Sequence, residues 1–121
     1  MDRFTDNGDN TITDTQTGLT WTKNTIASDV THEQAEKAVA DLGGEWRLPT
    51  IQELFTLVDH SRHLPAINTE VFPDTESDWY WSSTEASFSA SARWVVYFGY
   101  GDVGGFPRTH DACVRAVRAG Q

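Results

Sequence analysis

The acidic residues between positions 61 and 78 are the first candidates for chemistry in this chain of 121 residues. Asp74, Glu76 and Asp78 lie close together, and no basic residue follows Arg62 in this segment. The segment contains two prolines and few periodic apolar positions, so we expect an irregular loop, and loops of this length inside a domain are often functional. Its carboxylates would attract a basic partner and accelerate its association.

Aromatic residues near the polar loops of the second half would complete such a surface. An aromatic ring beside a polar loop supplies a large contact area at a low entropy cost and is a typical interface anchor. The predicted partner-binding residues are Asp74, Glu76, Asp78, Trp79, Phe88, Tyr100, Asp102, Phe106 and Arg108, and His110 extends the same surface.

An acidic N-terminal hairpin competes with this choice. Its carboxylates are those of Asp2, Asp6, Asp9 and Asp14. We interpret this cluster as turn chemistry and not as a calcium site, because it lacks the spacing and the terminal glutamate of an EF-hand loop.

We find no recognisable catalytic or cofactor-binding pattern in the sequence. His60 and His63 stand three residues apart beside Asp59, but they fall where a helix is expected to end, which favours solvated histidines over a metal site. The single cysteine, Cys113, excludes an internal disulfide. The chain has no Gly-x-Ser-x-Gly motif and no phosphate-binding glycine loop. We therefore expect a non-enzyme with no cofactor and no metal.

Two helix starts organise the rest of the chain. Capping boxes begin at Thr31 and Thr50, where a hydroxyl and the side chain three residues later satisfy two backbone N–H groups. Pro49 ends a short strand before the second box. Apolar residues follow each box at helical spacing, which predicts helices over residues 31–42 and 51–59.

Strands are expected on both sides of these helices. Residues 2–23 read as strands joined by tight turns, with Asn7-Gly8 as a two-residue hairpin signal. Further strands are expected over residues 93–98, over residues 103–106 at an edge stopped by Pro107, and over residues 113–117, with Arg115 and Arg118 on one phase of the last strand.

Five sequence blocks carry a family resemblance. They occur in order at residues 3–9, 17–21, 46–54, 80–84 and 114–118. With these blocks the chain resembles the C-terminal domain of bacterial collagen-like adhesins, which has a C-type-lectin-like fold. The resemblance implies a single α+β domain over residues 1–121, with two helices flanking an antiparallel sheet and the terminal strands side by side.

The same resemblance carries expectations about chemistry. Relatives join a cysteine of the first helix to one of the last strand, and the matching positions here are Val39 and Ala116, an apolar pair that should meet in the core. The tripeptides with which sugar-binding C-type lectins hold calcium are missing, so calcium-dependent lectin activity is not expected. A chain that lacks both bridging cysteines suits a reducing compartment.

The charge balance limits the partners. The net charge is −9, from 18 acidic and nine basic residues, which disfavours direct binding to nucleic acid because such binding depends on lysine and arginine. No apolar run is long enough to span a membrane. The first family block begins at residue 3 and leaves no room for a signal peptide, so we expect a cytoplasmic protein.

These observations lead to two functional hypotheses. The first is a small acidic inhibitor of the phage or mobile-element type, which binds a basic nucleic-acid-handling complex such as CRISPR–Cas inside a bacterial cell. The alternative is an extracellular ligand-binding or adhesion domain from a longer secreted protein.

Overall fold

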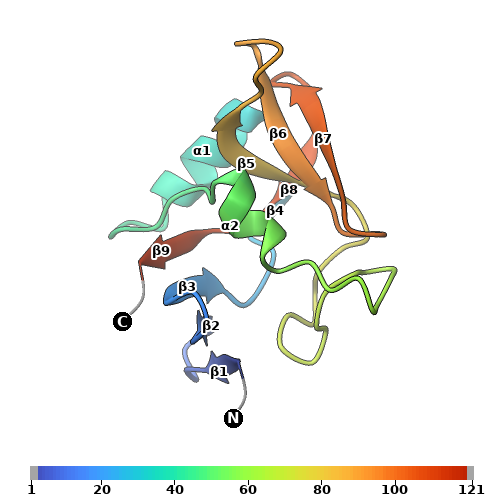
Figure 1. Ribbon diagram of the computed structural model, residues 1–121. Coiled ribbons are helices and arrows are strands. Elements are labelled where there is room, and N and C mark those ends of the chain that lie inside the picture. Colours follow the sequence, from blue (N-terminus) through green and yellow to red (C-terminus); the bar gives the residue numbers. More distant parts are fainter. Residues whose placement is uncertain (1–2, 120–121) are drawn as a thin grey trace.

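Nine strands and two short helices make up the computed structural model, which describes residues 3–119 (Figure 1). The strands are β1 (Phe4–Asp6), β2 (Thr11–Asp14), β3 (Leu19–Thr22), β4 (Ala27–Val30), β5 (Trp79–Glu85), β6 (Ala92–Tyr97), β7 (Asp102–Pro107), β8 (Ala112–Val114) and β9 (Val117–Ala119). The helices are α1 (His32–Ala40) and α2 (Ile51–Phe55).

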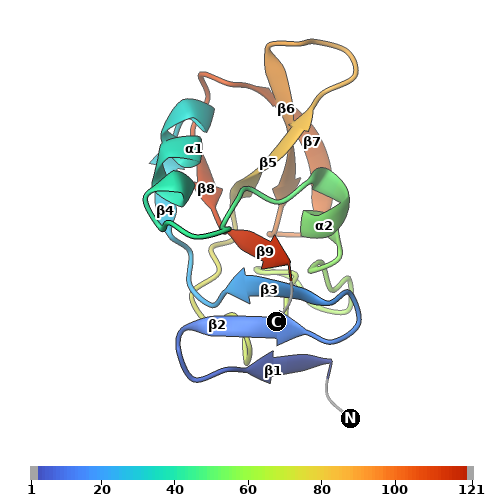
Figure 2. The same ribbon diagram turned by 90° about the vertical axis from the view of Figure 1, so that its left-hand side faces the viewer.

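The first sheet joins the two ends of the described chain. Its order is β1-β2-β3-β9 and every pairing is antiparallel (Figure 2). Gly8 and Gly18 take positive φ in the turns before and after β2, a conformation that glycine adopts without steric cost. The hairpin expected at Asn7-Gly8 forms, with four residues between its strands instead of two. The prediction that the terminal strands are neighbours is wrong: β1 and β9 belong to the same sheet but form its opposite edges, because the consecutive hairpins place β2 and β3 between them.

The second sheet has the order β4-β8-β5-β6-β7. Its pairings are antiparallel except between β5 and β8, which run parallel where Tyr80 pairs with Cys113. The long hairpin of β5 and β6 therefore lies in the middle, and β7 forms an open edge. An edge strand ending at Pro107 was predicted from the sequence and is confirmed.

Both capping boxes form as predicted. The Thr31 and Thr50 hydroxyls accept from the backbone N–H groups of Gln34 and Glu53. The predicted extent of α2 is wrong, because the helix ends at Phe55 instead of residue 59. The chain continues in turns that bury Leu57 in the core, so apolar side chains after the helix still face the core although the helix has ended.

The α+β, C-type-lectin-like fold class with two helices flanking a sheet is wrong. Strands dominate both layers, and the two helices have only nine and five residues. Both helices are shorter than predicted, because residues 41–42 and 56–59 form turns and irregular backbone instead of helix. One strand, β4, lies in a stretch where we had expected none.

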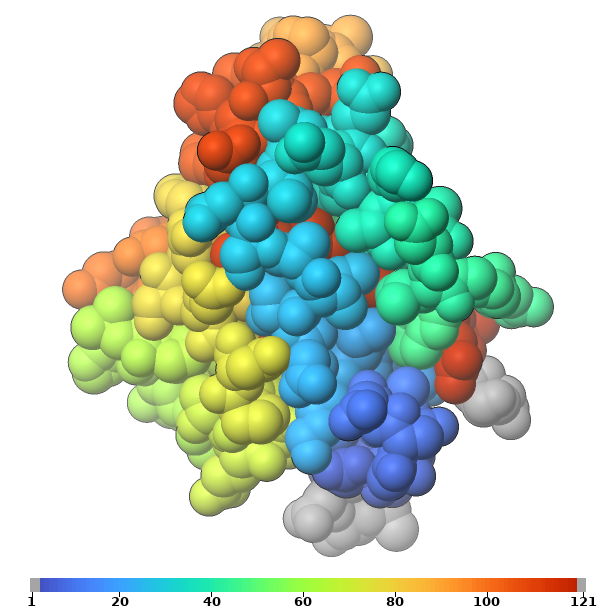
Figure 3. All heavy atoms as spheres, turned by 180° about the vertical axis from the view of Figure 1, so that it is seen from behind, coloured from blue at the N-terminus to red at the C-terminus, as the bar shows by residue number. Residues whose placement is uncertain are grey.

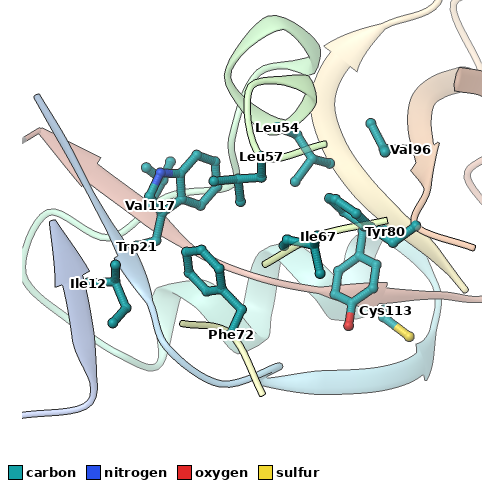
Figure 4. Packing of buried hydrophobic residues seen from close by; sticks show 11 residues of the cluster. Ile12, Trp21, Leu54, Leu57, Ile67, Phe72, Tyr80, Val96, Cys113 and Val117 are labelled. Atoms are coloured by element: carbon teal, nitrogen blue, oxygen red, sulfur yellow. The ribbon is translucent and has the colours of Figure 1, made fainter. Parts of the chain in front are cut away.

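Two clusters of apolar side chains lie on the two faces of the second sheet. Figure 4 shows the larger cluster, which contains Trp21 of the first sheet, Leu54 of α2 and Tyr80 of β5. The other cluster lies under α1 and contains Val39 and Ala116. The prediction that this pair shares the core is therefore confirmed.

The last predicted strand, over residues 113–117, is divided between the sheets. β8 ends at Val114 and β9 begins at Val117, so the chain crosses from one sheet to the other between them. Arg115 lies at this crossing and is fully buried, whereas Arg118 is partly exposed and lies over the Trp46 ring. The prediction that the two arginines share one phase is wrong, because residues three apart in a strand project from opposite faces and Arg115 lies between the two strands.

The irregular segment predicted over residues 61–78 is confirmed, and it begins earlier than predicted, since residues 56–60 also form neither helix nor strand. The segment buries Ile67 and Phe72 against the larger cluster, which fixes its path along the sheets. Neither of the two helices found in residues 3–119 has the length or the apolar character that crossing a membrane requires.

Candidate protein-binding face

Three aromatic rings form a row across the second sheet. The Trp79 ring lies 4.9 Å from the Tyr97 ring and 5.0 Å from the Phe106 ring, measured between centroids. The three side chains come from β5, β6 and β7 and are all partly exposed. Tilted rings at these distances attract one another beyond the effect of their buried area, so the row is a firm surface.

Strand alternation and one glycine produce this row. Trp79 pairs directly with Tyr97, so both side chains project from the same face of the sheet. Position 104 of β7 is on the same face of the sheet as Tyr97. A Cβ at Gly104 would lie only 3.1 Å from the Trp79 ring. The missing side chain therefore allows the indole to lie across the edge strand.

Two further rings extend the row at its ends. Tyr100, in the turn between β6 and β7, is 56% exposed and lies 6.0 Å from the Tyr97 ring. His110 lies 5.1 Å from the Phe106 ring at the other end. We call the five residues Trp79, Tyr97, Tyr100, Phe106 and His110 the aromatic face.

A carboxylate borders the Tyr100 end of the aromatic face. Asp102 pairs with Tyr97 across the β6–β7 register and is exposed. Asp78 comes immediately before β5, but its carboxylate lies 4.0 Å from the Cys113 sulfur, which belongs to the larger cluster on the opposite face of the sheet. This end of the face is therefore both aromatic and negatively charged.

The acidic loop, residues 74–78, is only partly free to contact a partner. Asp74 accepts a hydrogen bond of 2.9 Å from the Thr25 N–H, and Glu76 accepts one from the Ser28 hydroxyl. Figure 3 shows this segment, in yellow, packed against the blue residues before and within β4. Asp74 and Glu76 thus help to fasten the loop to the protein, which the sequence did not indicate.

Buried Arg115 fixes the position of this loop. Its guanidinium donates to the carbonyl oxygens of Thr22 and Lys23 at 2.6 and 2.8 Å and to the Thr75 hydroxyl at 2.8 Å. It also lies over the Phe72 ring, 4.7 Å from the centroid. Burial lowers the pKa of this guanidinium, because removal from water disfavours the charged form.

Two of the residues predicted for the surface lie elsewhere. Phe88, 66% exposed at the tip of the β5–β6 hairpin, packs on Trp94 and over Gly105, which belong to the opposite face of the sheet. Arg108 points toward α1, where its guanidinium lies 3.6 Å from the Glu36 carboxylate. Of the predicted residues, the structure thus brings together Trp79, Tyr100, Asp102 and Phe106.

Tyr97 is the residue that the sequence reasoning missed. It lies within a strand that the sequence predicted correctly, two positions after Val95. Strand alternation alone could have placed it on a common face with Val95, but only the register with β5 places it beside Trp79.

The competing N-terminal hairpin uses its carboxylates internally. Asp14 is buried and receives two hydrogen bonds from Arg3, at 2.9 and 2.7 Å. Asp6 pairs with Lys23, and Asp9 accepts from the backbone of Thr11. Asp2 lies outside the described residues.

The residues whose side chains could bind a metal together are not those that lie close together in the sequence. His60 contacts the Gly101 carbonyl oxygen at 3.2 Å, while His63 stacks on Tyr100, so the two histidines have separate partners. Glu76, Asp78 and Cys113, in contrast, place their ligand atoms within 4.8 Å of one another. Sequence spacing could not reveal this group, because the parallel pairing of β5 with β8 brings Cys113 to the acidic loop.

Comparison with known proteins identifies a domain family. The family model described as Lcl C-terminal domain matches residues 10–118. No curated protein matches the chain. The resemblance to the C-terminal domain of collagen-like adhesins is therefore wrong, and the C-type-lectin-like assignment that accompanied it has no support. The sequence blocks behind it mark strand ends, turns and a helix start, which are local features that unrelated domains share.

Proposed function

The chain belongs to the Lcl C-terminal domain family, and we propose that it is a non-enzymatic protein-binding domain whose contact surface is the aromatic face. The observation that carries this proposal is the row of three partly exposed rings, Trp79, Tyr97 and Phe106, beside an open sheet edge. Tyrosine and tryptophan are enriched among the residues that dominate binding energy at protein interfaces.

The aromatic face is suited to binding because it is already ordered. Its rings contact one another, so little side-chain entropy remains to be lost when a partner covers them. The neighbouring strand β7 offers unpaired backbone groups, to which an extended partner segment can add as a further strand. Surface area and backbone hydrogen bonds are therefore available at one place.

Charge favours a basic partner. Asp102 borders the Tyr100 end of the face, and the whole chain carries a net charge of −9. Such a field steers a positively charged protein toward the face and excludes acidic competitors. A basic protein that handles nucleic acid in the bacterial cytoplasm, such as a CRISPR–Cas complex, fits this description, and the domain would act as its inhibitor.

A capture experiment with paired variants tests the proposal. The immobilised protein is incubated with bacterial lysate, and the retained proteins are identified by mass spectrometry. We expect Tyr97→Ala and Tyr100→Ser to lose the partner that the unmodified domain retains, because they remove rings from the aromatic face. Leu42→Ser is the matched control, since Leu42 is also an exposed apolar residue but lies after α1. Equal retention by all variants would contradict the proposal.

Kinetics with the captured partner then separate the roles of charge and rings. Asp102→Lys should slow association, with a smaller salt dependence, whereas Tyr100→Ser should mainly accelerate dissociation. Competition between the domain and a nucleic acid for that partner would support the inhibitor hypothesis. Binding to an extracellular ligand instead would favour the alternative of an adhesion domain.

A further inference from the structure

Three side chains that bind metals in proteins meet beneath the acidic loop. Glu76 and Asp78 come from the loop, and Cys113 comes from β8. Their ligand atoms all lie within 4.8 Å of one another, and the Cys113 sulfur is 4.0 Å from an oxygen of Asp78. This group differs from a cluster of surface carboxylates because one of its members is a fully buried thiol from another strand.

The carboxylates of this group accept hydrogen bonds, Glu76 from the Ser28 hydroxyl and Asp78 from the Trp79 backbone N–H, but form no ion pair with a residue of the described chain. The ion pairs found between described residues do not include Glu76 or Asp78, although neighbouring Asp74 lies 3.9 Å from the Arg115 guanidinium. Two carboxylates are thus held close to each other and to a buried sulfur without a cation. Bringing like charges together is unfavourable, and a bound cation would remove that cost.

We propose that Glu76, Asp78 and Cys113 form a binding site for a divalent cation of the zinc class. Zinc accepts both thiolate and carboxylate ligands, whereas calcium and magnesium bind oxygen alone. The single sulfur therefore favours zinc or a chemically similar ion over the hard cations. The Ser28 hydroxyl, which already donates to Glu76, lies at the same place and can supply a further oxygen.

The ligands need only a small movement to close on an ion. Tetrahedral zinc, with bonds of about 2.3 Å to sulfur and 2.0 Å to oxygen, places those two ligands about 3.5 Å apart. The Cys113 sulfur and the Asp78 oxygen are already 4.0 Å apart. Glu76 is exposed and can complete the set by a change of rotamer.

Binding must release a proton from the thiol. Burial, together with the carboxylates of Glu76 and Asp78, raises the pKa of Cys113 to about 12, so the thiol is protonated near neutral pH in the absence of metal. The cation replaces this proton: the S–H bond breaks, a sulfur–metal bond forms, and one proton enters the buffer. Affinity should therefore increase with pH.

Cobalt(II) is the probe for this site, because a thiolate ligand gives it a characteristic near-ultraviolet charge-transfer absorption. We expect the purified protein to bind one Co²⁺ with this absorption, and Zn²⁺ to displace it. Calorimetry in two buffers of different ionisation enthalpy should show the release of about one proton per ion. Cobalt binding without the thiolate absorption, or no binding at all, would overturn the proposal.

Variants assign the ligands. Cys113→Ser should abolish the charge-transfer absorption, and Glu76→Gln and Asp78→Asn should each weaken binding by about tenfold or more. Glu70→Gln is the matched control, because Glu70 is an exposed carboxylate of the same irregular segment outside the group. Glu76 is exposed, so its variant tests the site even if Cys113→Ser does not fold. Wild-type affinity in Glu76→Gln and Asp78→Asn would refute the proposed ligand set.

Discussion

The carboxylates of the N-terminal hairpin and those of the acidic loop differ in what satisfies them. In the hairpin, Asp6 and Asp14 have basic partners, Lys23 and Arg3. In the loop, Glu76 and Asp78 have no ion pair among residues 3–119 and face the Cys113 thiol. Asp6 and Asp14 thus stabilise the fold of the hairpin, whereas Glu76 and Asp78 have no cationic partner among the described residues and remain available for a ligand.

The same contrast holds for the way each region is anchored. The carboxylates of the hairpin hold the hairpin in place. The loop is held by the buried cation Arg115, which donates hydrogen bonds to the Thr22 and Lys23 carbonyl oxygens and to the Thr75 hydroxyl of the loop. Glu76 and Asp78 can therefore be changed without loss of the hydrogen bond between Arg115 and Thr75. This separation of stabilising and exposed groups is what a binding site on a loop requires.

Arg115→Ala should have the largest effect on stability. It removes three hydrogen bonds, leaves the carbonyl oxygens of Thr22 and Lys23 without their donor, and opens a cavity beside Phe72. We expect the free energy of unfolding to fall by about 4 kcal/mol, measured by urea denaturation. Arg118→Ala is the control: this arginine is partly exposed over Trp46, and its loss should cost less than about 1 kcal/mol. Similar losses in both variants would show that Arg115 is not the anchor.

Asp14→Asn should have the next largest effect. The substitution neutralises a buried carboxylate that forms two hydrogen bonds with Arg3. We expect a loss of about 3 kcal/mol in the free energy of unfolding, because one charge of a hydrogen-bonded pair is left without its partner. The exposed pair of Asp6 with Lys23 provides the comparison, and Asp6→Asn should cost less than about 1 kcal/mol. A larger loss in Asp6→Asn than in Asp14→Asn would contradict this ranking.

Acid should weaken the hairpin through Asp14. Burial would raise the pKa of Asp14, but hydrogen bonds from Arg3 and from the Gln16 N–H outweigh it, so the pKa lies below its ordinary value of 3.8. The unfolded state therefore binds this proton first, and the contribution of Asp14 is complete above about pH 4 and is lost as the pH falls through the folded-state pKa. We expect unfolding experiments between about pH 4 and pH 2 to show a smaller loss of stability in Asp14→Asn than in the unmodified protein. Parallel pH profiles would refute this assignment.

Glu76→Gln should have the smallest effect. Its carboxylate is exposed and has no ion pair in the described part of the chain, and glutamine can still accept the hydrogen bond from Ser28. With a chelator present, the free energy of unfolding should change by less than about 0.5 kcal/mol. A loss comparable to that of Asp14→Asn would mean that the loop carboxylates are structural, which would remove the contrast between the two regions.

Part of the candidate site was predictable because it depends on local chemistry. The sequence identified the irregular segment, the edge strand at Pro107 and the aromatic residues Trp79, Tyr100 and Phe106. It assigned Phe88 and Arg108 to the same surface, which is wrong because Phe88, in the β5–β6 loop, packs on Trp94 and Gly105 at the opposite face and Arg108 turns toward α1. Nearness in sequence to a polar loop says nothing about which face of a sheet a side chain occupies.

The sequence by itself determined the features that depend on a few consecutive residues. Thr31 and Thr50 begin the helices because each hydroxyl and its capping-box partner satisfy nearby backbone groups. Gly8 and Gly18 form turns because they adopt positive φ without a clash. These interactions span at most four residues, so the chain needs no tertiary context to specify them.

Only the tertiary structure decided which distant residues meet. The parallel pairing of β5 with β8 brings Cys113 to Asp78, and the crossing between the two sheets buries Arg115 but leaves Arg118 partly exposed. These contacts join residues that are far apart in the chain, and their geometry depends on strand order and register. A shift of one residue in register would turn each side chain to the other face, so neither the anchor nor the metal-ligand group can be deduced from local pattern.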